Sequence, residues 1–471
     1  MSTKSVSGKT ELIKGLGPFS ATCMVVGSMI GSGIFIVSAD MASQVKSPGM
    51  LLLAWLVTGF VTIIAALSYG ELAAAMPNAG GQYVYLREAF GPMWGYLYGW
   101  TLFFVIQTGT IAAVAVAFGK FLNGFFPQLT MDPRWHLFSI ARWSVDVSQG
   151  QLAAIVALLV LGIANCYGIR WGAAIQNLTT VGKTIGLLGL ILLAVFYSRG
   201  DWSHLTPMKP ANTDVWSLGY LFIFGGAMVG SLFSSDAWNN VTFTSSEVKN
   251  PRRNLPLALG LGTTIVITLY LLANLGYLHV MSIQDITAFN ESKRPQTLTL
   301  GVHVVSIVGG AVWGKLLIAA ILVSVFGTMN GMSLAGARVY YAMARDGVFF
   351  KQLGRIHPRY HTPAFALIVQ ALWASILTLS GKYNELLDLV MFAIMVFYVM
   401  TVAGLFVLRR KRPDMERPYR AVGYPIVPAI YIVLAALISV AILHEKPYAL
   451  PGLIITLVGV PFYFIWKWKK A

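Results

Sequence analysis

Two interrupted apolar segments carry the residues of this sequence that are best suited to hold a small molecule. The first is VVGSMIGSGIFIV at 25–37, which has Gly-Ser-Gly in consecutive positions at 31–33, and the second is FIFGGAMVGSLFSSDAWNN at 222–240. An isolated pair of glycines four apart predicts close helix packing, but consecutive small residues favour an unwound backbone. Unwinding frees N–H groups at the start of one half-helix and carbonyl groups at the end of the other, with opposite dipoles. A zwitterion fits such a gap.

Two ionisable side chains also fall inside apolar runs. Lys183 in VGKTIGLL lies about nine residues into its run, hence roughly 13 Å deep at 1.5 Å per residue. Asp236 lies in the second interrupted segment. Charges at such depths are costly and are functional candidates by default. Lys183 could instead pair with helix-end carbonyls for stability alone, and Asp236 could either select a cationic ligand group or cap a half-helix N-terminus.

The elements that must position these residues are membrane-spanning helices. Hydrophobic residues make up 56% of the chain and charged residues 11%, with a mean hydropathy of +0.69, so polar surface is too scarce for a water-soluble globule. Continuous apolar runs long enough to cross about 30 Å of hydrocarbon recur about twelve times, without the alternation of barrel strands. They cover approximately 18–38, 49–76, 91–121, 150–168, 174–198, 216–242, 255–281, 311–343, 363–381, 384–408, 421–443 and 448–467. The interruptions fall in the first and sixth runs, which is typical of an inverted-repeat transporter with its site at the membrane midplane.

Basic residues are distributed unequally between the loops. The loops 244–254, 344–362 and 409–420 and the tail 467–471 are rich in lysine and arginine, whereas the opposite loops hold single lysines. We therefore expect both termini to be cytoplasmic. The net charge of +16 is then a topology signal that also attracts anionic lipid, above all through RRKRP at 409–413, and not a nucleic-acid footprint.

Several other classes of site are absent from the sequence. Cys23 and Cys166 both lie in predicted spans and are read as packing residues, and the seven histidines lack ligand spacing, so no metal and no cofactor are expected. Gly182-Lys183-Thr184 resembles the end of a phosphate loop, but the preceding glycine and strand are missing. We expect no enzyme.

Four motifs together resemble the amino acid–polyamine–organocation superfamily, within it most closely the L-amino acid transporter family, which includes bacterial exchangers and the light chains of heteromeric transporters. The motifs are GSGIF at 31–35, YGELAAAMPNAGGQYVY at 69–85, LFSSDAWNNVTFTSSEVKNPRRNLP at 232–256 and RRKRPDMERPYR at 409–420. The resemblance implies an all-α integral membrane protein of the LeuT-type 5+5 inverted-repeat fold, with about twelve helices and the first and sixth broken. It implies a cytoplasmic segment 1–17, repeats at 18–200 and 201–410, and two added helices with the C-terminus at 411–471.

The resemblance also implies a function. It predicts a secondary active transporter of neutral L-amino acids in the inner or plasma membrane, which exchanges substrates independently of sodium by alternating access. A cationic amino acid or polyamine transporter, favoured by Asp236, and a proton-coupled amino acid symporter are the alternatives. A channel or a membrane-embedded enzyme would differ in a single assay, because a channel shows no saturable counterflow and an enzyme consumes its substrate.

The site residues follow from the same resemblance. The substrate carboxylate would bind the backbone N–H groups of Ser32 and Gly33, with the Ser32 hydroxyl assisting, and the substrate ammonium would bind the carbonyls of Met29, Phe233 and Asp236. The full predicted substrate site is Met29, Ile30, Gly31, Ser32, Gly33, Phe233, Ser234, Asp236 and Asn239.

Gating and coupling residues are implied as well. Phe233 would close over the substrate, Trp238 and Asn239 would support the broken segment, and Trp238 and Glu71 are further gate candidates. Glu71 could form ion pairs at the inner face with groups near Glu247, Arg252 and Arg253, or could simply be solvated. Lys183 would take the place of a coupling sodium ion, with its ammonium touching carbonyls near Gly27 and Ile30 and with Ser324 in the matching part of the eighth helix.

A disulfide-linked partner subunit is not expected. The outer loop 122–149 has no cysteine, so the disulfide to a single-span subunit of the heteromeric relatives has no anchor. We expect the substrate and membrane lipids as the partners of an independently acting protein.

Overall fold

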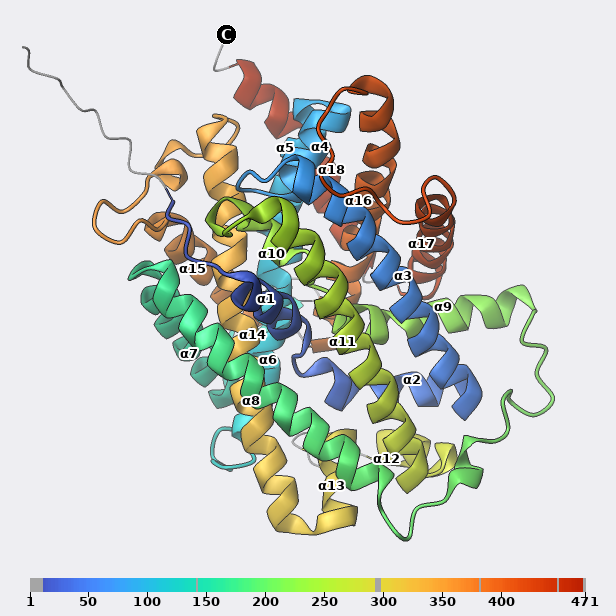
Figure 1. The fold of residues 1–471 in the computed structure, drawn as a ribbon. Coiled ribbons are helices and arrows are strands. Elements are labelled where there is room, and N and C mark those ends of the chain that lie inside the picture. Colours follow the sequence, from blue (N-terminus) through green and yellow to red (C-terminus); the bar gives the residue numbers. More distant parts are fainter. Residues whose placement is uncertain (1–11, 141–142, 293–297, 381–382, 447–448, 469–471) are drawn as a thin grey trace, which may run out of the picture.

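The computed structural model describes residues 12–140, 143–292, 298–380, 383–446 and 449–468, and its helices pack side by side into one bundle (Figure 1). Within these residues, ten helices are long and apolar enough to cross a membrane: Pro18–Val45, Pro48–Ala75, Pro92–Leu122, Gln149–Cys166, Trp171–Val195, Pro251–Val280, Ala311–Arg345, Glu385–Lys411, Ile426–Glu445 and Ala449–Trp468. Each matches a predicted run. The two remaining runs, 216–242 and 363–381, contain shorter apolar helices.

The individual elements subdivide these spans and add short pieces between them. The part of the chain before the second break contains α1 (Pro18–Met29), α2 (Gly33–Val45), α3 (Pro48–Ala75), α4 (Gln82–Phe90), α5 (Pro92–Thr101), a π-helical turn (Leu102–Ile106), α6 (Gln107–Leu122), β1 (Trp135–Ile140), β2 (Trp143–Val147), α7 (Gln149–Cys166), α8 (Ile169–Val195) and α9 (Leu218–Ser234). After it come α10 (Asn240–Phe243), α11 (Pro251–Val280), α12 (Ile283–Glu291), α13 (Leu300–Gly309), α14 (Ala311–Arg345), α15 (Ala364–Ser380), α16 (Tyr383–Lys411), α17 (Ile426–Glu445) and α18 (Ala449–Trp468). The antiparallel β1–β2 hairpin and the short helices α4, α12 and α13 were not predicted.

Both helices that the sequence predicts to be broken are interrupted at the predicted places. α1 ends at Met29 and α2 begins at Gly33, while α9 ends at Ser234 and α10 begins at Asn240. Within the second break Ala237 has a φ of 66°, in the left-handed region that costs a residue with a Cβ about 1–2 kcal/mol. The surrounding packing must therefore hold this segment in its non-helical path.

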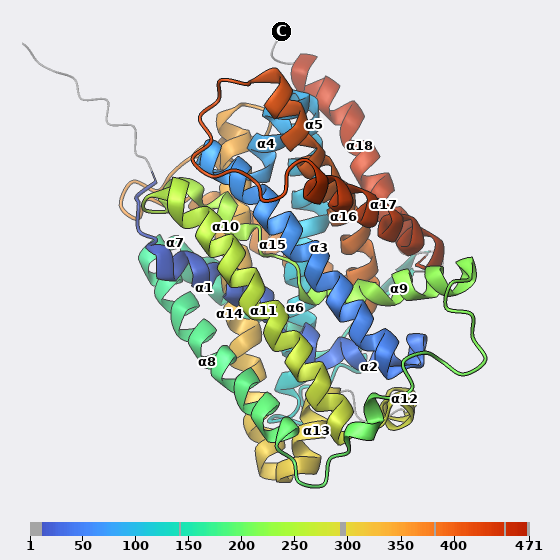
Figure 2. The same cartoon turned by 45° about the vertical axis from the view of Figure 1, so that its right-hand side comes forward.

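The four half-helices pair across the breaks. α2 lies beside α9 in both views (Figures 1 and 2), and α1 contacts α10. Because the N-terminal half of one broken helix meets the C-terminal half of the other at each end, the two broken helices run in opposite directions. This antiparallel crossing is the arrangement of the LeuT-type fold, and it brings both breaks to one level of the bundle.

The basic loops gather at one end of the bundle. Arg252 of the loop 244–254 pairs with Glu416 of the loop 409–420 at 2.8 Å, and Leu16 forms a parallel β-bridge with Val248. α12 and α13 lie at the opposite end (Figure 1). The loops that the sequence assigns to a single membrane face thus do share one face.

Candidate functional site at the helix breaks

The two breaks are in direct contact through a glycine. A Cβ on Gly33 would lie 2.2 Å from Ser234 Oγ and 3.1 Å from Ser234 Cα, so the start of α2 can approach the end of α9 only without a side chain. At Gly31 a Cβ would meet Thr328 side-chain atoms at an ordinary 3.6 Å. Gly33 therefore has no room for a Cβ at this contact, whereas Gly31 does.

A buried tyrosine of α11 joins the same two segments. The Tyr270 hydroxyl lies 2.9 Å from the carbonyl oxygen of Met29 and 3.1 Å from that of Ser234, and it can donate its single hydrogen to one of them at a time. The Met29 carbonyl, a predicted ligand of the substrate ammonium, thus already has a protein partner and keeps its second lone pair. Tyr270 is not among the predicted site residues, although a tyrosine inside an apolar span usually needs a hydrogen-bond partner.

α16 covers the first break from the other side. The Tyr383 hydroxyl lies 3.4 Å from Ser32 Oγ, and the Tyr383 ring meets the Phe233 ring edge-on at 6.1 Å between centroids. The Phe233 carbonyl, another predicted ammonium ligand, accepts the Asp236 N–H at 3.2 Å. Phe233, the predicted gate, therefore forms a layer over the break together with Tyr383.

Lys183 of α8 binds the open end of α1. Its Nζ atom donates to the carbonyls of Gly27 and Ile30, each at 2.7 Å, and to Thr328 Oγ1 at 2.8 Å, and its side chain is buried. Ser324 Oγ donates to the Ile30 carbonyl at 3.0 Å. The predicted contacts of Lys183 are present. Thr328, which the sequence analysis missed, lies one helical turn beyond Ser324 on the same face of α14.

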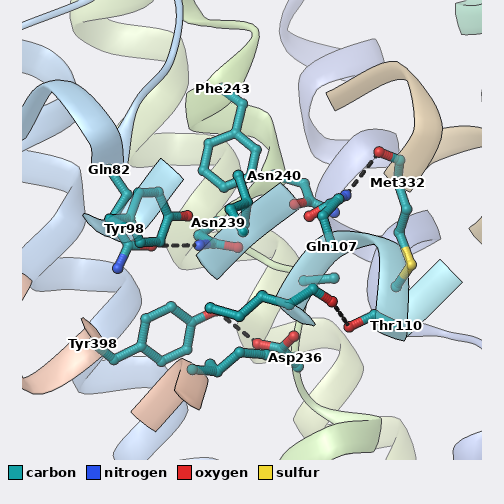
Figure 3. Close-up of a pocket in the computed structure, with 14 residues that line it drawn as sticks. Gln82, Tyr98, Gln107, Thr110, Asp236, Asn239, Asn240, Phe243, Met332 and Tyr398 are labelled. Carbon is teal, nitrogen blue, oxygen red and sulfur yellow. Dashed lines mark hydrogen bonds between the residues drawn. The ribbon is translucent and has the colours of Figure 1, made fainter. Parts of the chain in front are cut away.

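The second break is anchored to α16 at two points. Asp236 Oδ1 accepts a hydrogen bond from the Tyr398 hydroxyl at 2.6 Å (Figure 3). Asn239 Nδ2 donates to Gln82 Oε1 at 3.0 Å, and Gln82 Nε2 in turn donates to Thr401 Oγ1 at 3.0 Å. Any movement of the broken segment must therefore involve α16 and the short helix α4, which begins at Gln82.

A polar cavity adjoins the second break on the side of α5 and α6. It contains about 320 Å³ of space between atoms, part of which is open to solvent, and Figure 3 shows its labelled side chains around the Asp236–Tyr398 pair. Its polar lining residues are Gln82, Tyr98, Gln107, Thr110, Asp236, Asn239, Asn240 and Tyr398. So many hydrogen-bonding groups at the level of the breaks suit a polar ligand or ordered water.

The gate candidate Trp238 is fully packed. Its ring meets the Tyr69 ring edge-on at 4.8 Å and the Tyr398 ring at 5.2 Å between centroids. Trp238 is 1% exposed. This packing fits the supporting role that the family resemblance implies for Trp238.

The partners predicted for Glu71 are wrong. Glu71 is buried and binds Arg409 at 2.6 Å, Arg417 at 3.3 Å and the backbone N–H of Ala421 at 2.7 Å. It is neither solvated nor paired with Arg252 or Arg253, because the loop after α16 folds back over the end of α3. Glu71 instead joins these two elements through its ion pairs with Arg409 and Arg417.

A second buried ion pair links the segment that follows α10 to α14. Glu247 binds Arg338 of α14 at 2.7 Å, and both side chains are fully buried. The Glu247 carbonyl also accepts the N–H groups of Gly15 and Leu16, each at 3.0 Å. Glu247 thus ties the segment that follows α10 both to α14 and to the N-terminal segment.

The basic side chains of RRKRP, for which lipid contact is predicted, also make contacts within the protein. Lys411 Nζ donates to the Ala89 carbonyl at 3.0 Å, and Arg412 pairs with Glu88 at 2.5 Å. Burial acts to raise the pKa of the Glu88 carboxyl, but hydrogen bonds and charge from Arg87 and Arg412 outweigh it and hold the pKa below its usual value. These basic side chains thus bind α4 to the end of α16.

Comparison with known proteins agrees with this architecture. The family model described as amino acid permease matches residues 16–460. The chain is 30% identical over 464 residues to the serine/threonine exchanger SteT of Bacillus subtilis (strain 168), covering 98% of each chain. It is also 30% identical to the human large neutral amino acids transporter small subunit 2, covering 99% of this chain and 83% of the relative, and 30% identical to the mouse b(0,+)-type amino acid transporter 1, covering 100% and 91%. The chain therefore belongs to the amino acid permease family of the amino acid–polyamine–organocation superfamily.

Proposed function

We propose that this protein exchanges neutral L-amino acids across the membrane by alternating access at the two helix breaks. The observation that carries the proposal is the meeting of two oppositely directed broken helices at Gly33 and Ser234. At this meeting the free N–H groups at the start of α2 suit a carboxylate, and the free carbonyl groups at the end of α1 suit a cation. A zwitterion requires this pair of partners. The printed names of the relatives, which include an exchanger and a neutral amino acid transporter, support the same substrate class.

The substrate contacts follow from the geometry of the breaks. The backbone N–H groups of Ser32 and Gly33 bind the substrate carboxylate, and the carbonyls of Met29 and Asp236 bind the ammonium. Phe233 closes over the substrate from the side of Tyr383, whose hydroxyl already reaches Ser32. In this assignment 18–200 and 201–410 are the inverted repeats.

Exchange is independent of sodium in this proposal. The Lys183 ammonium already supplies a positive charge to the carbonyls of Gly27 and Ile30, which a sodium ion would otherwise coordinate. Lys183 thereby couples the shape of the first break to substrate occupancy.

The membrane arrangement and partners are part of the proposal. The basic loops at one end of the bundle support a cytoplasmic location for both termini of a protein held in the inner or plasma membrane. Cys23 and Cys166 both lie in helices, so we propose action without a disulfide-linked subunit.

Counterflow in proteoliposomes tests the function. The purified chain is reconstituted in vesicles loaded with an unlabelled neutral amino acid, and entry of the labelled amino acid is followed with sodium or with choline outside. We expect saturable entry that needs internal substrate and is the same in both salts. Entry without internal substrate, or only with sodium, would contradict exchange as proposed.

The cationic alternative rests on Asp236, and a substrate panel tests it. The Asp236 carboxylate lines the polar cavity but already accepts a hydrogen bond from Tyr398, which favours a structural over a substrate-selecting carboxylate. We expect Asp236→Asn to retain part of the neutral amino acid exchange. If the parent instead transports lysine or arginine strongly and the variant loses that transport, the cationic assignment is correct.

A further inference from the structure

Asp236 is a buried carboxylate without a cation to balance it. It is 7% exposed, and no lysine, arginine or histidine in the described part of the chain forms an ion pair with it. The buried ammonium of Lys183 is already bound to two carbonyls and a hydroxyl. An unpaired carboxylate is expensive in such surroundings, so a proton or an incoming cation must neutralise it.

The groups that face Asp236 are neutral phenols from three different helices. Tyr398 of α16 donates to its carboxylate at 2.6 Å, while Tyr98 of α5 and Tyr431 of α17 line the two cavities beside it. Apart from Asp236, no described residue that lines either cavity is charged. The protonation of Asp236 is therefore set by burial and by hydrogen bonds from the Tyr398 hydroxyl and the Ala237 backbone N–H, not by a neighbouring charge.

Asp236 lines two cavities beside the break. The first is the polar cavity of Figure 3, and the second contains about 260 Å³ of space, part of it open to solvent, between α3, α9, α16 and α17. Each is lined by one buried polar group that has no hydrogen-bond partner in the described residues, Asn240 Nδ2 in the first and Ser235 Oγ in the second. Unpaired buried polar atoms beside a cavity are where ordered water binds.

We propose that Asp236 is a proton-binding site, reached through water in these two cavities, whose protonated form is the one that closes around a neutral amino acid. The step transfers one proton from a hydronium ion of the bulk solvent, relayed by water in a cavity, to a carboxylate oxygen of Asp236: an O–H bond of the hydronium ion breaks, the O–H bond of the carboxyl group forms, and neutral water remains. A neutral amino acid brings no net positive charge to pair with the carboxylate, so the protonated carboxyl is the form that can be buried here without an unpaired negative charge. This inference rests on the exchange function proposed above and adds a pH dependence to it.

The pH profile of counterflow tests the inference in three variants. With the same pH on both sides, we expect wild-type exchange to fall at least about fivefold from about pH 5.5 to about pH 8.5, because Asp236 loses its proton. Asp236→Asn, which resembles the protonated carboxyl in shape and charge, should vary less than about twofold over that range. Tyr398→Phe removes a hydrogen bond that favours the ionised carboxylate, so the midpoint of its profile should move to higher pH.

A matched control is Asp40→Asn. Asp40 is another partly buried carboxylate in a membrane span, and it accepts a hydrogen bond from Gln44 at 2.8 Å. We expect Asp40→Asn to keep the wild-type pH profile. A flat wild-type profile, or an unshifted profile in Tyr398→Phe, overturns the proton site even if Asp236→Asn does not fold, whereas absence of counterflow at every pH would instead contradict the exchange function itself.

Discussion

Replacing Lys183 with alanine is expected to reduce exchange at least tenfold, or to make it unequal in the two directions across the membrane, while the protein remains folded. The ammonium makes two charge-assisted bonds to the carbonyls of Gly27 and Ile30, at 2.7 Å each, and such bonds contribute about 1.5–3 kcal/mol apiece. About 1.4 kcal/mol changes an equilibrium tenfold. The loss of either bond in one conformation and not the other would therefore shift the equilibrium between the inward-facing and outward-facing conformations about tenfold or more. Counterflow measured separately for inside-out and right-side-out vesicles checks the result.

The structure explains why the variant should still fold. Thr328 Oγ1 lies 3.1 Å from the Gly27 carbonyl and 3.0 Å from that of Ile30, and Ser324 Oγ also reaches Ile30, so hydroxyl donors remain at the break. Thr184→Ala is a matched control, since the Thr184 hydroxyl bonds only the Thr180 carbonyl of its own helix. Full exchange in Lys183→Ala, with the same rate in both directions, would remove Lys183 from the coupling mechanism.

The helices of the bundle could be predicted from the sequence because each continuous run of apolar residues is a local signal. Ten predicted runs match helices long enough to span, since continuous apolar stretches have no other way to satisfy their backbone in a membrane. The two breaks were predicted for a similar reason, as consecutive small residues favour an unwound backbone. The contacts of Lys183 with Gly27 and Ile30 came from the family resemblance, not from residue spacing.

What could not be predicted depends on pairs of residues far apart in the chain. Glu71 finds Arg409, and Tyr398 finds Asp236, only after helices from the two ends of the sequence have packed together. Charge near a helix end predicts solvation equally well, which is why the partner of Glu71 was assigned wrongly. Tyr270 gave a signal as a buried hydroxyl in need of a partner, but the signal does not say which carbonyl it binds.

Gly33→Val is expected to abolish substrate binding without preventing insertion into the membrane. A Cβ at this position would lie 2.2 Å from Ser234 Oγ, well inside van der Waals contact, and valine adds two methyl groups beyond it. Overpacking of this kind costs about 1–3 kcal/mol, but here the strain falls on the N–H groups that the substrate carboxylate needs, so we expect affinity to fall at least about tenfold. Binding of a labelled neutral amino acid to the purified variant measures the effect.

A series of substitutions separates loss of the site from general damage. Gly33→Ala should show a smaller loss in the same direction, because alanine lacks the two further methyl groups of valine but its Cβ would still lie 2.2 Å from Ser234 Oγ and 2.8 Å from Ser234 Cβ. Gly189→Val is the matched control on α8, where a Cβ would have nothing within 4 Å, and it should bind like the parent. Gly31→Ala, whose Cβ would meet Thr328 at an ordinary 3.6 Å, should lose less affinity than Gly33→Ala. Wild-type affinity in Gly33→Val would place the carboxylate elsewhere, since no arrangement of this contact accommodates valine and leaves the start of α2 against the end of α9.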